Sequence, residues 1–253
     1  MDHERNSATT SPRRWRRHLA TTVVVAAIVY VLVAYIALPL GWLEYGRHHP
    51  TLEGVPTITH TGDDIPGDPL NVALVGSERE LKTALLAAGW DPADPLTLKS
   101  CLEIAEATVL SRRYNDAPVS NLYLFNRKED LAFEKPVGDN PRQRNHVRFW
   151  KTTQVAHDGR PVWVGSATFD ERVGLSETTG QITHHVAPNI DAERDRLMND
   201  LRAAGQIGEV FMKPGFQPVR EGRNGGGDRW ETDGDLAGAY LTSTAAKPAP
   251  ATP

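Results

Sequence analysis

The chain has 253 residues, of which 40% are hydrophobic and 24% charged, and this suits one globular domain of medium size with additional segments. The formal net charge is −4, and 23 basic and 30 acidic residues follow position 18. That acidic balance argues against nucleic acid as a partner and against adhesion to anionic lipid by charge. The single cysteine, Cys101, excludes an intrachain disulfide and a multi-cysteine metal site.

A long apolar run near the N-terminus predicts a membrane span. Residues Leu19 to Leu40 read "LATTVVVAAIVYVLVAYIALPL" without a charge, and about 22 residues are close to the ~20 that cross a bilayer as a helix. Four arginines precede the run between positions 13 and 17, so the positive-inside rule places the N-terminus in the cytoplasm and the remainder across the membrane. A cleaved signal peptide has a shorter apolar region of ~7–15 residues. We therefore expect a single-pass, uncleaved signal anchor.

Composition divides the chain into five predicted segments. Residues 1–12 form a disordered cytoplasmic N-terminus, residues 13–42 the basic cluster and transmembrane helix, and residues 43–67 a juxtamembrane linker rich in Pro, Gly and Asp. Residues 68–242 form the folded domain, and residues 243–253 a disordered Pro/Ala-rich tail. With no disulfide available, the folded domain depends on its core for stability.

Three helices are expected in the folded domain. Ser77 begins the first as a capping box with Glu80 three residues later, and Gly89 ends it. A second helix is expected over residues 97–113 and a third over residues 189–205, because apolar residues recur there at helical spacing.

Strand-like segments account for most of the remaining domain. They are residues 70–77, 121–125, 131–135, 146–155, 161–169, 181–186, 207–213, the surroundings of Trp230, and 239–241. The turn signal "HDG" at residues 157–159 predicts that two of them form a hairpin. The fold class is therefore α+β, a mainly antiparallel sheet with about three helices, preceded by one N-terminal transmembrane helix.

Two adjacent histidines in "QITHHVAPNIDAERDRL" raise the question of an active site. Adjacent side chains on a strand point to opposite faces, so the pair cannot bind one metal from a continuous strand. His184 shares a face with apolar neighbours, which predicts a hydrogen-bonded core histidine, and His185 is then the freer of the two. Asp191 and Glu193 follow in the first turn of a helix, where the macrodipole favours carboxylates, so a structural role explains them.

The segment "NPRQRNHVRFW" has the densest positive charge of the domain. In an extended strand, alternation places four basic side chains on one face, Arg142, Arg144, His146 and Arg148. Val147 and Phe149 then face the core. The repulsion between these cations can be offset by solvent, by the acids Asp170, Asp191 and Glu193, or by an anionic ligand such as a phosphate or carboxylate held by bidentate arginines.

Several catalytic and metal motifs are missing from the sequence. It contains no H-E-x-x-H, Walker, EF-hand, cysteine-zinc or G-x-S-x-G pattern. The run "RNGGGDRW" at residues 223–230 is rich in glycine but lacks the spacing of a P-loop or dinucleotide fingerprint. We therefore expect no metal and no cofactor.

Four blocks of the sequence resemble the LssY C-terminal domain family of bacterial membrane-associated proteins. The blocks are "LYLFNRKEDLAFEKP", "NPRQRNHVRFW", "WVGSATFD" and "THHVAPNIDAERD", within about residues 70–212. The family has no established activity, and similar domains occur beside DedA-like or phosphatidic-acid-phosphatase-like membrane segments, whose Ser-Gly-His element is missing here. The resemblance carries over ten polar residues, Arg142, Arg144, His146, Arg148, Asp170, His184, His185, Asp191, Glu193 and Arg194.

Three functions are compatible with these observations. The first is an envelope binding module at the bacterial plasma membrane, in which Arg142, Arg144, Arg148, Arg194, Asp170 and His184 bind an anionic lipid headgroup, a glycan or an envelope protein. The second is a membrane-tethered hydrolase of a phosphate or glycan, with His146 or His185 as general acid or base and Asp191 or Glu193 orienting it. The third is a structural or secretion accessory.

Overall fold

The computed structural model describes residues 12–41, 50, 52–93, 121–138, 143–178, 180 and 182–242. The expected helix over residues 97–113, Cys101, Arg142 and the C-terminal tail lie outside the described residues. The chain divides into two compact units, Met1–His49 and Pro50–Pro253, and each is considered by itself.

The described part of the N-terminal unit is one long apolar helix. Helix α1 spans Pro12–Leu32 and continues through a π-helical segment, η1, at Val33–Ala37. Within the 24 residues from His18 to Gly41, the 18-residue window with the mean hydropathy of 2.7 has none of its residues buried within the structure. By length and composition this helix can cross a membrane, at the position that the sequence predicted.

The π-helical segment has a local cause in Pro39. In η1 the N–H of Leu38 donates to the carbonyl of Val33, five residues earlier. The ring of Pro39 has no N–H to donate, and in an α-helix it clashes with the carbonyl four residues before it, that of Tyr35. A single wide turn at this point removes the clash without ending the helix.

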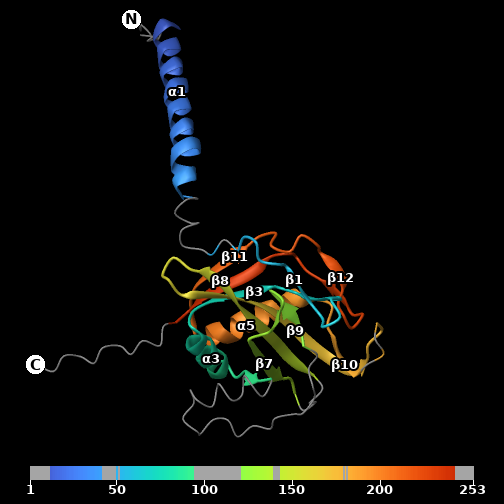
Figure 1. The fold of residues 1–253 in the computed structure, drawn as a ribbon. Coiled ribbons are helices and arrows are strands. Elements are labelled where there is room, and N and C mark those ends of the chain that lie inside the picture. The colour runs from blue at the N-terminus through green and yellow to red at the C-terminus, as the bar shows by residue number, and fades with distance from the viewer. Residues whose placement is uncertain are drawn as a thin grey trace, which may run out of the picture. The chain divides into compact units, whose positions relative to one another are not determined.

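The folded unit is built on an eight-stranded sheet (Figure 1). Its strands are β3 (Val72–Val75), β4 (Asp91–Pro92), β7 (Leu131–Pro136), β8 (Arg144–Val155), β9 (Pro161–Leu175), β10 (Ile182–Val186), β11 (Ile207–Lys213) and β14 (Leu236–Leu241). The order is β11-β14-β3-β9-β8-β7-β4, with β10 paired to β9, and only the β14–β3 pair is parallel. The expected fold class, α+β with a mainly antiparallel sheet, is confirmed.

Two smaller sheets complete the described strands. One has the order β2-β1-β5-β6, from β1 (Ile58–His60), β2 (Pro66–Pro69), β5 (Tyr123–Leu124) and β6 (Arg127–Lys128). The other pairs β12 (Glu221–Arg223) with β13 (Arg229–Glu231). Strand β1 lies within residues 43–67, where the sequence suggested a linker, and Leu52 before it is buried in the core.

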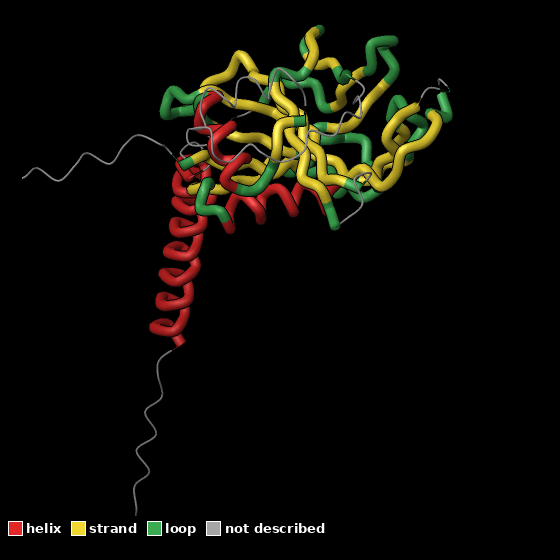
Figure 2. Tube along the Cα trace, turned by 90° about the horizontal axis from the view of Figure 1, so that it is seen from below, coloured by secondary structure: helices red, strands yellow, loops and turns green. Residues whose placement is uncertain are grey.

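The first and third expected helices are present. Helix α3 (Glu78–Ala87) begins with the capping box of Ser77 and Glu80, and helix α5 (Ile190–Ala203) is capped by the side chain of Asn189. Helix α5 contacts β9 and β14, and it runs along one side of the strands (Figure 2).

The two faces of the main sheet bury different cores. The face toward the helices packs Val147 and Phe149 of β8 against Leu197 and Leu201 of α5, as the alternation in the sequence predicted. The opposite face packs Trp150 with Val162, Val164, Leu122 and Leu124. Because side chains alternate along a strand, Arg144, His146 and Arg148 share this second face with Trp150.

Candidate functional site

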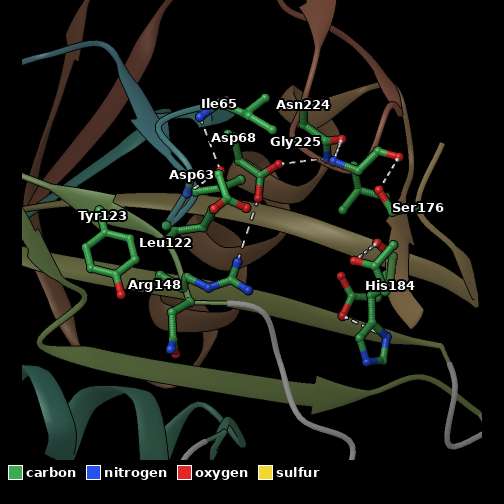
Figure 3. A pocket seen from close by; sticks show the side chains of 18 residues that line it. Asp63, Ile65, Asp68, Leu122, Tyr123, Arg148, Ser176, His184, Asn224 and Gly225 are labelled. Atoms are coloured by element: carbon green, nitrogen blue, oxygen red, sulfur yellow. Dashed lines mark hydrogen bonds and ion pairs between the residues drawn. The ribbon is translucent and has the colours of Figure 1, made fainter. Parts of the chain in front are cut away.

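A cavity of about 320 Å³ lies where the second face of the main sheet meets the smaller strands (Figure 3). We call it the Asp68–Arg148 pocket. Its described lining residues are Thr61, Gly62, Asp63, Ile65, Gly67, Asp68, Asn121, Leu122, Tyr123, Arg148, Asp170, Ser176, Thr183, His184, Val186, Asn224, Gly225 and Gly226. They come from the β1–β2 segment, the start of β5, strands β8, β9 and β10, and the loop between β12 and β13.

Strands β8 and β9 supply a polar patch beside and beneath the pocket. The antiparallel register pairs Arg144 with Asp170, His146 with Thr168, and Arg148 with Ser166. All six side chains share one face and are nearly inaccessible, with residue exposures between 1% and 6%. Arg148 and Asp170 line the pocket, and the other four lie beside them on the same face.

Arg144 is fully engaged by protein groups. Its Nη1 donates to Glu134 Oε2 at 2.6 Å and its Nε to Asp170 Oδ2 at 3.1 Å. Its Nη2 lies 2.9 Å from His184 Nε2. A guanidinium only donates, so Nε2 accepts, and neutral His184 carries its proton on Nδ1, which is 3.6 Å from Asp170 Oδ2.

Arg148 faces a second buried carboxylate. Its Nη1 is 3.7 Å from Asp68 Oδ2, and Asp68 Oδ1 accepts a hydrogen bond from Asn224 at 3.0 Å. Burial raises the pKa of Asp68, although Arg148 and Asn224 act in the opposite direction. Burial likewise raises the pKa of Asp170 against the opposing charges of Arg144 and Arg148. The arginines therefore compensate these carboxylates only in part.

The two histidines of this face are neutral at pH 7. Burial lowers the pKa of His146 well below its ordinary value, and the charges of Arg148 and Arg144 lower it further. Burial, followed by the charge of Arg144, lowers the pKa of His184 to about 4. Neither imidazole therefore adds positive charge to the pocket.

Several buried polar atoms on this face have no hydrogen-bond partner among the residues that the structure describes. They include His146 Nε2, Ser166 Oγ and Thr168 Oγ1. An unsatisfied buried polar group costs ~1–3 kcal/mol, so the face favours contact with polar rather than apolar atoms.

Comparison with known proteins identifies the part of the chain that carries this geometry. The family model described as LssY C-terminus matches residues 52–236. The chain belongs to the LssY C-terminal family. No curated protein and no solved structure matches it. The matched residues contain the whole described lining of the pocket, so the pocket is a feature of the LssY C-terminal domain itself.

The histidine pair of the LssY C-terminal domain fits our prediction in part. His184 is hydrogen-bonded as expected, through Arg144, but it lines the pocket, whereas His185 is 3% exposed and its Nδ1 lies 2.6 Å from Asp228 Oδ1. The expectation that His185 is the freer of the two was wrong, because Val186, the apolar neighbour taken as a core residue, lines the pocket together with His184. Asp228 covers the His185 side chain and also accepts a hydrogen bond from the backbone N–H of Val186.

The glycine-rich run is the part of the pocket that the sequence did not reveal. Asn224 Oδ1 accepts the N–H groups of Gly226 and Asp228, which folds the loop back on itself, and Asn224 Nδ2 reaches Asp68. Asn224, Gly225 and Gly226 thereby form one wall of the pocket. An Asn followed by glycines is a recognisable turn signal, but nothing local in the sequence indicates that it meets Asp68.

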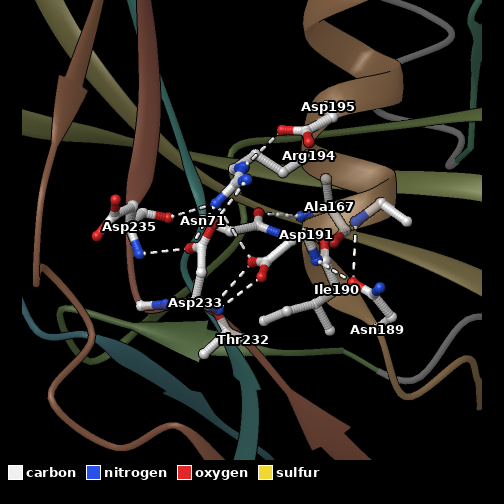
Figure 4. A network of polar contacts seen from close by, with 12 residues as sticks. Asn71, Ala167, Asn189, Ile190, Asp191, Arg194, Asp195, Thr232, Asp233 and Asp235 are labelled. Atoms are coloured by element: carbon white, nitrogen blue, oxygen red, sulfur yellow. Dashed lines mark hydrogen bonds and ion pairs between the residues drawn. The ribbon is translucent and has the colours of Figure 1, made fainter.

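Asp191 and Arg194 belong to a separate network (Figure 4). Arg194 donates to Asp233 through both terminal nitrogens at 2.8 and 3.1 Å, to Asp235 O at 2.9 Å and to Asp195 at 2.8 Å. Asp191 accepts from Thr232 Oγ1 at 2.7 Å. This network joins the start of α5 to the segment between β13 and β14, and it supplies no residue of the described pocket lining.

Glu193 is also separated from the histidines that it was expected to orient. It lies on α5, which packs on the sheet face opposite to His146. Glu193 is 3% exposed, and burial raises its pKa to about 8. Its Oε1 has no hydrogen-bond partner in the part of the chain that the structure describes. Among the described residues, no hydrogen bond or ion pair connects Asp191 or Glu193 with His146 or His185.

The described part of the chain contains no arrangement of side chains that could bind a metal ion. No group of three or more His, Cys, Asp or Glu side chains is placed there to hold an ion. Arg142, the remaining predicted site residue, lies outside the described residues.

Proposed function

We propose that the protein is a single-pass bacterial envelope protein whose extracytoplasmic domain holds a small polar ligand in the Asp68–Arg148 pocket. The basic residues before the apolar helix support a cytoplasmic N-terminus at the plasma membrane. The observation that carries the proposal is the pocket itself, in which polar groups from six segments converge on a rigid sheet. Its volume of about 320 Å³ is at the lower end for ligand sites, which suits one headgroup or one sugar unit.

The geometry favours binding over catalysis. A general base needs to reach the reacting group, and His146 lies outside the described lining while His184 is occupied by Arg144. His185 and Asp228 form a close pair, but neither is a described lining residue. Of the arginines expected to clamp an anion, Arg144 is instead neutralised internally, because it binds Glu134 and Asp170.

Binding can be tested on the full chain in lipid nanodiscs, since sugar-based detergents would compete for a sugar site. Saturation-transfer NMR with N-acetylglucosamine, glycerol, ethanolamine and glycerol phosphate as probes is expected to give at least one saturable signal. Tyr123→Ala removes a lining side chain and should abolish that signal, whereas Phe125→Ala truncates a nearby exposed aromatic outside the described lining and should not. Absence of any signal, or a signal that Tyr123→Ala leaves intact, contradicts the proposal.

Orientation has its own test. A periplasm-dependent reporter, such as alkaline phosphatase, fused after Pro253 is expected to be active, while a reporter that folds only in the cytoplasm is inactive there. The reverse pattern contradicts the proposed topology.

A hydrolase is the second candidate, and one observation favours it. Burial raises the pKa values of Asp68 and Asp170, and a raised pKa makes a carboxyl better suited to act as a general acid toward a glycosidic or phosphate ester oxygen. Turnover of nitrophenyl glycosides or nitrophenyl phosphate that Asp170→Asn abolishes would support this candidate. Saturable binding without turnover supports the binding module.

A further inference from the structure

We infer that the ligand of the Asp68–Arg148 pocket carries a primary ammonium group, held by Asp63 and Asp68 and facing the ring of Tyr123. This inference rests on the proposed binding function and specifies the charge of the ligand. An amino sugar and an aminoalcohol headgroup share this chemistry. The inferred ligand is positively charged, whereas the arginine-rich sequence suggested an anionic ligand.

The described lining has more negative than positive side chains. Asp63, Asp68 and Asp170 contribute three carboxyl groups, and Arg148 contributes one guanidinium. Arg144 beside the lining pairs with Asp170 and Glu134, so including these two neighbours leaves four carboxyl groups against two guanidiniums. His184, the histidine of the described lining, is neutral at pH 7 because burial and the charge of Arg144 lower its pKa to about 4. A phosphate or carboxylate entering the pocket would therefore meet net repulsion, whereas a cation would be attracted.

The positive charges beside the pocket are already used by the protein. Arg144 binds Glu134 and Asp170, and Arg148 faces Asp68. Neither guanidinium is placed as a clamp for an incoming anion, which needs two parallel donors directed at it.

One carboxylate of the lining is available to a ligand. Asp63 is exposed at the edge of the pocket, and its side chain makes no hydrogen bond or ion pair with another described residue. Asp68 lies deeper, and burial raises its pKa despite Arg148, so it gains from an additional positive neighbour. Asp63 and Asp68 line the same pocket, and an ammonium offers three N–H donors to such acceptors.

The side chains of the described lining also fit a polar cation. Tyr123 contributes an aromatic ring to this lining, and an aromatic face attracts a cation within about 6 Å of its centre. Thr61, Thr183 and Asn224 contribute polar side chains to the same lining. A ligand that combines an ammonium with hydroxyl groups complements both features.

The test uses two series of compounds that differ mainly in charge. Glucosamine, glucose and glucuronate share a ring, and ethanolamine, ethylene glycol and glycolate share a two-carbon frame. Calorimetry or NMR titration of the full chain in nanodiscs at neutral pH is expected to rank cation above neutral above anion within each series. One added ion pair corresponds to roughly tenfold in affinity between glucosamine and glucose, and the difference should shrink as salt is added. Glucosamine binding more tightly than ethanolamine identifies a sugar source, and equal affinity identifies a headgroup amine.

Adjacent aspartates provide matched variants. Asp63→Asn removes a carboxylate of the lining, and Asp64→Asn makes the same change at a neighbour outside the described lining whose φ of 59° asparagine tolerates. Asp63→Asn should lower the affinity for glucosamine to near that for glucose and leave glucose binding unchanged, while Asp64→Asn changes neither.

The outcomes separate the two proposals. Equal affinity across a series, or a preference for glucuronate or glycolate, overturns the ammonium inference. If that binding is still abolished by Tyr123→Ala, the proposed binding function of the pocket remains supported. Binding that Asp63→Asn leaves unchanged also overturns the inference alone. Absence of binding by all six compounds counts against both.

Discussion

Two clusters of the domain each contain one buried arginine with carboxylate partners, and they differ in the solvent exposure of those carboxylates. Arg144 and Arg194 have almost equally buried side chains, 3% and 5% exposed. The partners of Arg144, Glu134 and Asp170, are 12% and 3% exposed, whereas Asp195 and Asp233 beside Arg194 are 60% and 50% exposed. The exposure of the carboxylates, more than that of the arginine, therefore decides how much each cluster depends on its pairing.

Removing Arg144 should have the largest effect. Arg144→Met leaves Glu134 and Asp170 buried without their cation, and the expected loss is ~3–5 kcal/mol in the free energy of unfolding. Urea denaturation of the full chain, followed by tryptophan fluorescence, measures this loss. Arg202→Met is the control, because Arg202 is exposed and its side chain hydrogen-bonds to Asn199, so the substitution should change stability by less than ~0.5 kcal/mol. A loss for Arg144→Met as small as that of the control would show that water reaches this cluster.

Glu193 shares one property with each cluster. It precedes Arg194 in the sequence, but its carboxyl is buried like the partners of Arg144. Burial raises the pKa of Glu193 from 4.5 to about 8. At a pH between these two values, the folded state therefore keeps a proton on Glu193 that the unfolded state has released. Stability from this group is fully present below about pH 4.5 and is lost as the pH rises through about 8. Glu193→Gln should remove this loss and stabilise the protein at alkaline pH by on the order of 3 kcal/mol. Parallel stability–pH curves for the two proteins would contradict the assignment.

Arg194→Met should cost less than the Arg144 substitution. Solvent can hydrate Asp195 and Asp233 once the guanidinium is gone, so we expect a loss of ~1–2 kcal/mol, mostly from broken hydrogen bonds. The same denaturation experiment compares the two arginines directly. An equal loss for both would mean that partner exposure is not the deciding property.

Asp63→Asn should have the smallest effect on folding. The exposed Asp63 side chain makes no hydrogen bond or ion pair with another described residue, so the free energy of unfolding should change by less than ~0.5 kcal/mol, as for Asp64→Asn. Thermal denaturation without ligand is the measurement. A clear destabilisation by Asp63→Asn alone would give this carboxylate a role in the fold.

Local sequence signals predicted local structure well. The capping box at Ser77, the "HDG" turn at residues 157–159 and the alternation of Val147 and Phe149 each depend on residues within a few positions, and all are confirmed. Strand β1 was missed because three residues in a Pro- and Gly-rich segment carry too little periodicity to indicate a strand.

The pocket was predictable only in part. Arg148, Asp170 and His184 were singled out from the sequence, and the structure brings them to one cavity. Asp68 and Asn224 were not, because they are separated by 156 positions and meet only through the tertiary fold. The sign of the charge was also hidden, since counting arginines along one strand cannot show that a neighbouring strand and β2 supply the carboxylates that neutralise them.

The wide turn before Pro39 affects how the apolar helix can meet a neighbour in a bilayer. A π turn inserts one extra residue, which rotates everything after it by ~100° around the helix axis. Side chains up to Leu32 and those from Leu38 onward therefore belong to stripes that point in different directions. A second helix lying straight alongside can follow one stripe only, so any lateral pairing would be confined to one part of the bilayer thickness.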